Sequence, residues 1–579
     1  MASTSETSRI ESTETLGWFR GMMTFLFFVS GVINLLALTG SFYMLQIYDR
    51  ALTSQSVETL VAISILAIGL YLLQGMLDVA RSQILVRLGT KTGRRLAPLA
   101  HRVAMDMPRF GYGPVEANER LRDVDTLQQF VSGQGPIALL DLPWMPLYLA
   151  FIYMLHPWLA ALVVGGALTL GSLTLVTELL TKASSSPSQK AALQRTSIAD
   201  TNIRNVEVLR SMGSLGYALE RFERANKDHL ELQLKTSDVS STFSGISKVL
   251  RMVLQSAVLG LGAYFVIKGE LSAGSIIAAS VSSARALAPI DMAIGQWKGF
   301  VAARRSYRRL KETIAALDKA PPAVVLPRPS KTLKVEKLTV AAPGTGTVLL
   351  SDVSFEVQAG QAVGIIGHSG SGKSTLARAL TGVWPSLRGN IRLDNADIAQ
   401  WDPDLLGKYI GYLPQDVALM DGTIGEMISR FEPDADSDDI VAAARSAGAH
   451  DMIVRLARGY GTQLGPLGTA LSSGQRQRIA LARALYKKPF LIVLDEPNSN
   501  LDADGEAALA DAILKIREAG SIAVVVAHRP SALKYVDLIG VMQTGKLAAF
   551  GAKDDVLASQ TMNSSASPLK PKIAAVGGV

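Results

Sequence analysis

The feature that most constrains this chain lies near its start, where residues 21–48 contain no charged side chain. At 1.5 Å per residue, a helix of this length exceeds the roughly 20 residues needed to cross the hydrocarbon of a bilayer. The preceding 20 residues are rich in Ser, Thr and Glu rather than basic, and the apolar stretch is longer than the core of a secretory signal. Residues 21–48 therefore predict a membrane span that is not cleaved.

Further apolar segments predict six spans in all. The fifth and sixth spans have weaker hydropathy, because Arg251, Arg285 and Asp291 lie in or beside them. The five additional spans are residues 59–77, two helices within 131–177 that fold back at His156-Pro157-Trp158, and residues 246–267 and 271–295.

The basic residues predict how these spans are oriented. Nine Lys or Arg residues lie in 78–134 and nine in 181–245, whereas 49–56 and 268–270 carry one each. Basic loops stay in the cytoplasm, so both long segments and both termini are expected there. Because residues 188–288 contain no proline and show apolar residues at helical spacing, the long segments are expected to be helices extending from the membrane.

The composition excludes cysteine chemistry and argues against a nucleic-acid partner. The chain has 579 residues and no cysteine, which rules out disulfides, thiolate metal sites and a cysteine nucleophile. The net charge of +8 does not indicate a nucleic-acid partner, because much of the basic excess lies beside spans, where it sets topology.

A proline-rich linker predicts a second domain. The segment from Ala320 to Pro329 contains four prolines, and the sequence after it has a soluble composition. The predicted organisation is a cytoplasmic N-terminal segment 1–20, a transmembrane domain 21–319 with two long cytoplasmic helical extensions, a linker 320–332, a second domain 333–553 and a disordered tail 554–579.

A phosphate-binding loop stands early in the second domain. A β-type apolar run leads into Gly367-x-x-x-x-Gly372-Lys373-Ser374, and a helical pattern follows. In such a loop backbone N–H groups approach the phosphates, Lys373 neutralises their oxygens and Ser374 holds Mg²⁺.

Two further segments support this assignment. Residues 490–496 form an apolar strand ending in Asp495, a predicted Mg²⁺ ligand, and Glu496, a predicted general base for the attacking water. Upstream, Leu471-Ser-Ser-Gly-Gln475 opens a basic amphipathic helix, which is typical of an anion-binding helix start.

These motifs, in this order and spacing, resemble the nucleotide-binding domain of ATP-binding cassette (ABC) transporters. The residues that carry the resemblance are GHSGSGKST, Gln415 in YLPQD, LSSGQRQR, LIVLDEP, SNLD at 499–502 and His528 in VVAHRP. The implied fold is an α-helical membrane domain with six transmembrane helices of the ABC exporter type plus an α/β P-loop nucleotide-binding domain.

The resemblance also implies cofactors, site residues and a homodimer. In the family two domains sandwich two ATP molecules, so the signature turn of one chain contacts the nucleotide held by the P-loop of the other, and one set of motifs implies two identical chains. Glu496, His528 and Gln415 are the implied catalytic residues, and Ser374, Gln415 and Asp495 the implied Mg²⁺ ligands. The implied ATP-binding residues are Gly367, His368, Ser369, Gly370, Ser371, Gly372, Lys373, Ser374, Thr375, Ser472, Gly474 and Gln475.

Segments of the membrane half narrow the resemblance to type I secretion ATPases of the protease-exporter (PrtD-like) kind. The segments are 141–158, 208–215 and 262–298. This resemblance implies export of unfolded proteins with a C-terminal signal across the bacterial inner membrane, through an inner-membrane adaptor and an outer-membrane channel, with membrane lipid around the spans. The short segment before the first span, without a peptidase-like domain, favours the protease, lipase and S-layer branch.

Some residues depart from the family pattern. The segment 337–348 has no aromatic residue where relatives stack one on adenine, Pro466 stands where exporters usually have a Glu, and Met427 replaces a common Asn. We expect altered base contacts and altered coupling between domains, but an active ATPase.

Alternatives remain open for one residue and for the cargo. Asp141, in an apolar segment beside prolines, either lines a substrate path or satisfies backbone groups that the prolines free. The rival functions are an exporter of lipids or small amphiphiles and an ATP-binding regulatory protein without turnover.

Overall fold

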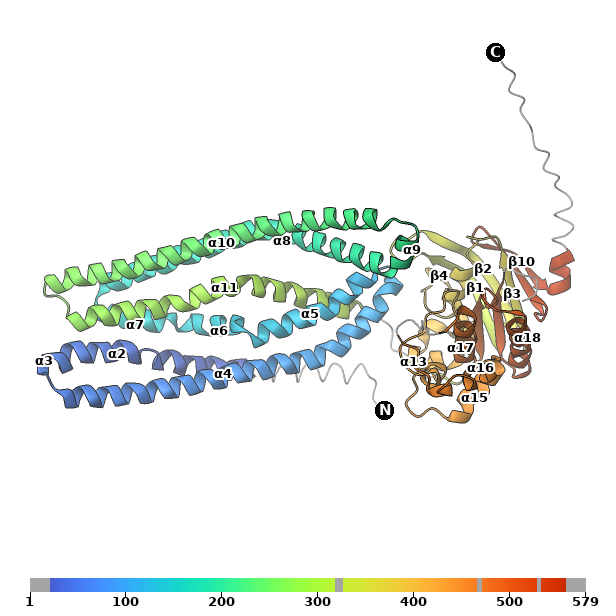
Figure 1. Cartoon of the computed structure of the whole chain (residues 1–579), viewed down its shortest axis with the longest axis horizontal. Helices are drawn as coiled ribbons and strands as arrows, with labels where there is room; N and C mark the ends of the chain where they lie inside the picture. Colours follow the sequence, from blue (N-terminus) through green and yellow to red (C-terminus); the bar gives the residue numbers. More distant parts are fainter. Residues whose placement is uncertain (1–20, 318–325, 466–470, 528–532, 559–579) are drawn as a thin grey trace, which may run out of the picture. The chain divides into compact units, whose positions relative to one another are not determined.

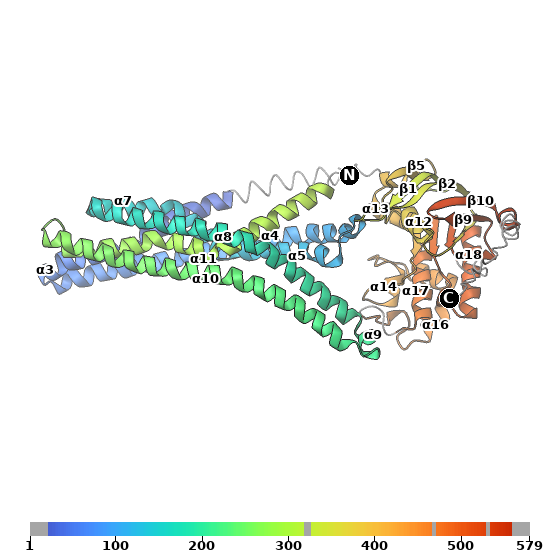
Figure 2. The same ribbon diagram turned by 90° about the horizontal axis from the view of Figure 1, so that it is seen from above.

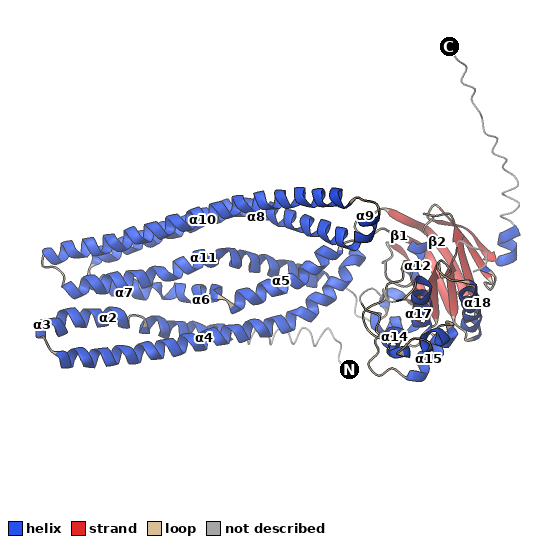
Figure 3. Ribbon diagram, in the orientation of Figure 1, coloured by secondary structure: helices blue, strands red, loops and turns tan. Residues whose placement is uncertain are grey.

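The computed structural model of the chain describes residues 21–317, 326–465, 471–527 and 533–558. These fall into two compact units. One is helical and contains residues up to 319 except Arg109–Tyr112, and the other contains Arg109–Tyr112 and the chain from Ala320 onward. Figure 3 shows that the strands lie in the second unit.

The helical unit consists of long helices that run alongside one another (Figures 1 and 2). In the described part of the chain, six helices are long and apolar enough to cross a membrane, so the prediction of six spans is confirmed. Residues 21–36 are helical. The elements that follow are α2 Thr39–Gln46, the π-helical η1 Ile47–Ala51, α3 Leu52–Ser54, α4 Val57–Asp106, the 3₁₀-helical η2 Met107–Phe110, α5 Pro114–Ser132, α6 Gln134–Asp141, the 3₁₀-helical η3 Leu142–Trp144, α7 Met145–Leu155, α8 Pro157–Arg204, α9 Val206–Ser211, α10 Leu215–Ile267 and α11 Ala273–Leu317.

The helices extend well beyond the predicted spans. The two last spans, predicted as 246–267 and 271–295, belong to α10 and α11, which continue to Leu215 and Leu317 respectively. Charged residues end an apolar run without ending a helix, because Lys, Arg and Glu are good helix formers. The predicted fold-back is present, since α7 ends at Leu155 and Pro157 begins α8, a position where the missing N–H of proline costs nothing.

Asp141 lies in a buried polar cluster of the helical unit. Its Oδ1 accepts hydrogen bonds from Arg81 at 2.8 Å and from Asn34 Nδ2 at 2.9 Å. The Tyr148 hydroxyl donates to Asn34, and Arg81 also donates to Ser30 Oγ. Asp141 is 6% exposed. Through its bonds to Asn34 and Arg81 it connects the third span to the first and the second. This arrangement favours a structural role for Asp141 over the lining of a substrate path. Asp141 binds side chains, however, and not the backbone groups that the prolines free.

The second unit combines two sheets with helices. The four-stranded sheet has the order β2-β1-β4-β5, and the six-stranded sheet has the order β10-β9-β3-β8-β7-β6. Within the latter, β9, β3, β8, β7 and β6 are parallel and β10 is antiparallel. The strands are β1 Thr332–Ala341, β2 Val348–Gln358, β3 Ala362–Gly367, β4 Arg388–Leu393, β5 Ala396–Asp397, β6 Ile410–Leu413, β7 Leu491–Asp495, β8 Ile522–Val526, β9 Leu538–Gln543 and β10 Lys546–Ala552. The helices are α12 Lys373–Leu380, η4 Ile398–Gln400, α13 Pro403–Tyr409, α14 Ile424–Ile428, α15 Ser437–Ser446, α16 His450–Val454, η5 Gly459–Gly461, α17 Ser473–Leu485 and α18 Ala503–Glu518.

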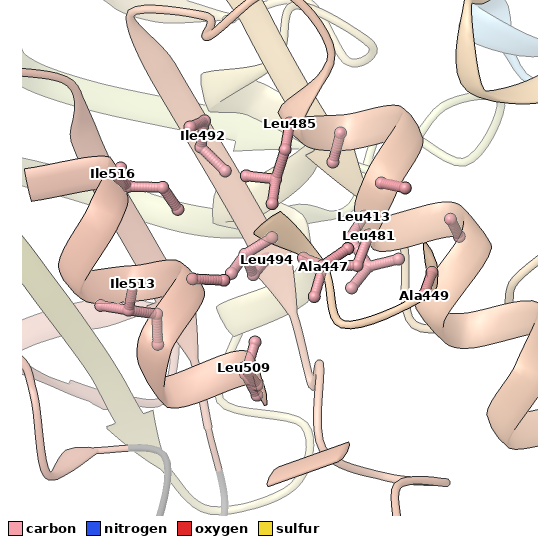
Figure 4. Close-up of a cluster of buried hydrophobic side chains, with 14 of the residues drawn as sticks. Leu413, Ala447, Ala449, Leu481, Leu485, Ile492, Leu494, Leu509, Ile513 and Ile516 are labelled. Carbon is pink, nitrogen blue, oxygen red and sulfur yellow. The ribbon is translucent and has the colours of Figure 1, made fainter. Parts of the chain in front are cut away.

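A hydrophobic core joins the six-stranded sheet to its covering helices. Ile492 and Leu494 of β7 pack against Leu485 of α17 and Ile513 of α18 (Figure 4). All five residues of β7 and all five of β8 are buried, as expected for central parallel strands covered on both faces. This core holds the carboxyl ends of the central strands in place.

The structured part of this unit exceeds the predicted nucleotide-binding domain 333–553 at both ends. The Asp394 carboxylate accepts hydrogen bonds from the backbone N–H groups of Ser330, Lys331 and Thr332, so the end of the predicted linker 320–332 is fixed to the domain. At the other end residues 553–558 are helical and Val556 is buried in the core, within the predicted tail 554–579. Composition could not predict that residues 330–332 and 553–558 are fixed to the domain, because each contact is made by a single side chain, Asp394 or Val556.

Candidate nucleotide-binding site

The P-loop connects β3 to α12. Gly372 precedes the helix with φ 99°, and a Cβ there would lie 2.7 Å from Leu350 Cδ2, so the position requires glycine. Of the other predicted residues of the loop, His368, Ser369 and Gly370 are exposed, whereas Ser371 and Thr375 are buried. The strand-loop-helix arrangement predicted from the motif is therefore present.

Lys373 is held by the loop that it follows. Its Nζ donates hydrogen bonds to the carbonyl oxygens of Gly367 and His368, both at 2.9 Å. Burial lowers the pKa of Lys373, and the carboxylates of Glu496 and Asp495 oppose that shift. The ammonium group thus lies inside the loop, where it can neutralise phosphate oxygens.

Ser374 and Asp495 are brought together from distant parts of the sequence. The Ser374 hydroxyl donates to Asp495 Oδ1 at 3.2 Å, and Asp495 is 2% exposed at the end of β7. Burial raises the pKa of Asp495, while the hydrogen bond from Ser374 and the charge of Arg378 on α12 lower it. Sequence reasoning did not single out Arg378.

The oxygen atoms of this pair fit Mg²⁺. This ion prefers oxygen ligands and is usually held by one or two protein groups together with substrate phosphates. Among the described residues no three His, Asp or Glu side chains gather to hold a metal ion, so a cation here depends on the nucleotide for its remaining ligands. A hydroxyl and a carboxylate beside a P-loop match that requirement.

Glu496 leaves the strand directly after Asp495. It has φ 50°, its N–H donates to Val526 O at 3.0 Å and its carbonyl accepts from Ser499 N at 3.2 Å. The sequence predicted a strand over 490–496, whereas β7 ends at Asp495. The left-handed turn, rather than strand alternation, therefore separates the directions of the two carboxylates.

Gln415 lies at the same edge of the six-stranded sheet. It is exposed, two residues beyond the end of β6. In the parallel pairing of β6 with β7, Leu413 stands opposite Leu494, the residue before Asp495. Gln415 thus follows the same sheet edge as the two carboxylates.

The signature turn begins α17 with a capping box. Ser472 Oγ accepts from the Gln475 N–H at 3.3 Å, and Gln475 Oε1 accepts from the Ser472 N–H at 2.9 Å. Ser472 is exposed and Gly474 is partly exposed. A Cβ at Gly474 would lie 3.0 Å from Asn500 O, which is a tight contact. The turn is therefore rigid and open to solvent.

Gln477, which sequence reasoning did not name, links this helix to the segment after Glu496. Its buried Nε2 donates to Pro497 O, and its Oε1 accepts from Asn500 N at 3.1 Å. The signal in the sequence was an amide on the apolar face of an amphipathic helix. The signature helix and the turn that carries Glu496 are thus connected by one side chain.

His528 and Pro466 lie outside the described residues, so the roles predicted for them stay predictions. The segment 337–348, where relatives carry an aromatic, spans the end of β1 and the turn into β2. Met427 is buried in the core on α14.

A P-loop domain with a signature turn, preceded by six long apolar helices, defines the class of ABC transporters. Family models agree with this assignment: the model described as ABC transporter matches residues 350–499, and the model described as ABC transporter transmembrane region matches residues 21–289. A solved structure titled as a bacterial Atm1-family ABC exporter with ATP bound shares the fold, with a TM-score of 0.78, 22% identity and coverage of 95% of this chain and 99% of that one.

Two relatives narrow the family. The type I secretion system ATP-binding protein PrsD of Rhizobium meliloti (strain 1021) is 48% identical over 528 residues, which cover 91% of each chain. The toxin RTX-I translocation ATP-binding protein of Actinobacillus pleuropneumoniae is 26% identical over 537 residues, 92% of this chain and 75% of that protein. The chain belongs to the ABC transporters of type I secretion systems. The predictions of fold class and of an ATP hydrolase coupled to transport are confirmed.

Proposed function

We propose that this protein is the ATP-driven inner-membrane exporter of a type I secretion system. The observation that carries the proposal is the 48% identity to a type I secretion ATP-binding protein along 91% of both chains, together with a P-loop, a metal-binding oxygen pair and a base at one sheet edge. The cargo is an unfolded protein with a C-terminal signal, as expected for the PrtD-like branch.

Hydrolysis uses residues described above. Lys373 and the N–H groups of the P-loop bind the β- and γ-phosphates, and Glu496 accepts a proton from the attacking water. The water oxygen forms a bond to the γ-phosphorus, and the bond from this phosphorus to the bridging oxygen breaks, releasing ADP. Mg²⁺, bound by Ser374 and Asp495, would supply charge neutralisation on the phosphate oxygens.

The signature turn acts on a second copy of the chain. Ser472 and Gly474 are accessible at the start of α17, and the helix N-terminus favours an anionic ligand. A two-fold dimer pairs each signature turn with the partner's P-loop and so builds two identical sites. Binding of ATP closes the dimer and its hydrolysis reopens it, which shifts the spans between two states.

The other proposed partners complete the secretion system. An inner-membrane adaptor and an outer-membrane channel continue the path beyond the spans, whose extracytoplasmic turns are short. The termini and the nucleotide-binding domain lie in the cytoplasm, in agreement with the basic residues of the long helical extensions.

The test compares the proteins in the culture medium of cells expressing the wild type or Glu496→Gln, matched for expression and membrane insertion. Glu518→Gln, an exposed residue at the end of α18, is the matched control. We expect one or a few proteins to vanish from the medium with Glu496→Gln alone, and their release to need an intact C-terminus. An unchanged protein profile would contradict protein export, and the same cultures would then be compared for lipids and small amphiphiles.

A further inference from the structure

An arginine that the nucleotide site does not use holds the C-terminal end of the signature helix α17. Arg430 Nε donates a hydrogen bond to Arg483 O at 3.1 Å, and its Nη2 donates to Ala484 O at 3.3 Å. Both acceptors lie in the last turn of α17, where the final carbonyls have no partner within the helix. The helix dipole also favours a cation at this end. Arg430 therefore caps α17 at the end opposite the signature turn.

The same guanidinium also binds the start of strand β6. Arg430 Nη1 donates to Ile410 O at 3.1 Å, and at 2.7 Å to a carbonyl oxygen of the preceding helix α13. The last turn of α17 packs directly on this strand, because a Cβ at Gly411 would lie only 2.1 Å from Ala484 O. One side chain thus binds four backbone carbonyls and joins α17 to β6.

The last turn of α17 also reaches the segment beyond Gln415. Arg483, which lies in this turn, donates from Nη1 to Ala418 O at 3.5 Å. Ala418 stands three residues after Gln415, and Ile410 stands five residues before it. The segment that carries Gln415 is therefore bound to the C-terminal end of α17 on both sides, through Ile410 and through Ala418.

The chain adopts a costly backbone conformation to place Arg430. Arg430 and the following Phe431 both have φ 59°, in the left-handed region that bulky side chains rarely adopt. The Phe431 N–H donates to Glu426 O at 2.8 Å, which holds the turn after α14. Burial, and after it the charge of Arg483, lower the pKa of Arg430 to about 10, so the side chain stays a cation at neutral pH. All of its N–H groups can then donate.

We propose that Arg430 is a positioning residue that fixes α17 to the Gln415 segment and thereby links the two ATP sites of a dimer. The proposal rests on the paired sites of the proposed function. In such a dimer Gln415 serves the nucleotide on the P-loop of its own chain, whereas the signature turn contacts the nucleotide of the partner. A movement at one nucleotide then reaches the other along α17, which makes ATP hydrolysis cooperative.

The dependence of hydrolysis on ATP concentration tests this role in purified full-length transporter in lipid nanodiscs. Two coupled sites give a Hill coefficient of up to about 2, and independent sites give about 1. Arg430→Met removes the bonds to α17 and β6, whereas Arg430→Lys keeps the charge on a compact ammonium that cannot bridge them. Arg517→Met is the matched control, because Arg517 of α18 binds Tyr535 O at 3.2 Å and the Asp537 carboxylate beside β9.

We expect cooperative hydrolysis by the wild type, a Hill coefficient close to about 1 in both Arg430 variants, and a kcat lowered about fivefold or more. Binding of fluorescent ATP without Mg²⁺ reports the P-loop of each chain and should stay within about twofold, because the bonds of Arg430 go to other elements. Arg517→Met should lower the melting temperature and keep the wild-type Hill coefficient. Gly411→Ala, which pushes β6 and α17 apart without touching Arg430, should lower the coefficient as well.

Four outcomes would overturn the proposal. These are hydrolysis without cooperativity in a dimeric wild type, a wild-type Hill coefficient in Arg430→Lys or Gly411→Ala, an equal loss of cooperativity in Arg517→Met, and fluorescent ATP binding weakened as much as kcat. The mass of the purified particles separates this failure from a failure of the proposed function. Dimers with any of these outcomes contradict the role of Arg430 alone, whereas monomers contradict the paired sites themselves.

Discussion

The hydroxyl of Ser374 donates a hydrogen bond of 3.2 Å to Oδ1 of Asp495, although 121 positions separate the two residues in the sequence. Ser374 is the second residue of α12, which follows β3, and Asp495 ends β7, with β8 between the two strands in the sheet. The sheet order therefore places both residues of the proposed metal-binding pair at the edge where the P-loop lies.

The first prediction concerns Mg²⁺. Ser374→Ala removes one of the three proposed oxygen ligands, so we expect the Mg²⁺ concentration for half-maximal ATPase activity to rise about tenfold or more. The measurement is an Mg²⁺ titration of ATP hydrolysis by purified transporter. Thr381→Ala removes a hydroxyl at the other end of α12, where it bonds only to its own helix, and should leave the titration unchanged. Equal titrations for the two variants would contradict a ligand role for Ser374.

A second prediction concerns pH. Burial raises the pKa of Asp495 above the ordinary aspartate value of about 3.9. A protonated carboxyl does not bind Mg²⁺, so as pH falls through this raised pKa, the proton displaces the metal and Mg²⁺ affinity drops. We expect the loss of Mg²⁺-dependent nucleotide binding in acid to begin at a higher pH than an ordinary aspartate would give.

Ser374→Ala tests the direction of this pH dependence. The hydrogen bond from Ser374 lowers the pKa of Asp495, so its removal should move the acid limb of Mg²⁺-dependent binding to still higher pH. Binding of fluorescent ATP at a series of pH values checks both expectations. A shift to lower pH in Ser374→Ala would show that another group controls the limb.

Gln477 gives a third prediction. Its amide joins α17 to the segment after Glu496, and the side chain is 3% exposed. Gln477→Ala leaves Asn500 N–H and Pro497 O without this partner, which should cost about 1–3 kcal/mol of stability and lower kcat. Thermal unfolding and ATP hydrolysis of the purified protein measure the two effects.

The conservative variant separates the two bonds of Gln477. Gln477→Glu keeps an acceptor for the Asn500 N–H but turns a buried carboxylate oxygen toward Pro497 O, so its melting temperature should fall at least as far as that of Gln477→Ala. If both variants hydrolyse ATP at the wild-type rate, the link does not position Glu496.

A fourth prediction addresses the buried pair Arg81 and Asp141. Asp141→Ala removes the buried partner of Arg81 and leaves it only the half-exposed Asp78, which should cost about 1–3 kcal/mol. Combining Arg81→Met with Asp141→Leu removes both charges and should recover most of this loss. Thermal unfolding in detergent or lipid nanodiscs measures both changes.

The exposed pair Arg224 and Glu220 serves as the control for that experiment. Glu220→Gln removes a salt bridge of 2.5 Å on the surface of α10 and should not change the melting temperature measurably. A double variant as unstable as Asp141→Ala would show that packing around Asp141, rather than the charge left without its buried partner, causes the loss.

The parts of the site whose geometry depends only on neighbouring residues could be predicted from the sequence. The P-loop at Gly367–Ser374 and the strand that ends at Asp495 follow from apolar runs and glycines, which act within a few residues. The sequence predicted a helical extension before the fifth span, and α10 indeed runs from Leu215 to Ile267, but it did not predict that α11 continues to Leu317, because hydropathy changes at the membrane surface while the helix continues.

Contacts between distant segments could not be read from the sequence. Arg81 lies just past the uncharged run 59–77 and was counted with a basic loop, although α4 carries it to the side of Asp141. Gln477 stands out as an amide on an apolar helix face, but nothing near it in the sequence predicts its bond to Pro497. Both assignments require the packing of helices and strands that are far apart along the chain.

The Arg81 pair also has a consequence for the order in which the membrane protein is made. Arg81 emerges from the ribosome 60 residues before Asp141 and before its third span exists. Until then it is paired with Asp78 of its own helix, at 2.6 Å, which lowers the cost of its charge in lipid. We therefore expect the second span to enter the membrane with this charge already paired, and the third span to add Asp141 to an existing pair.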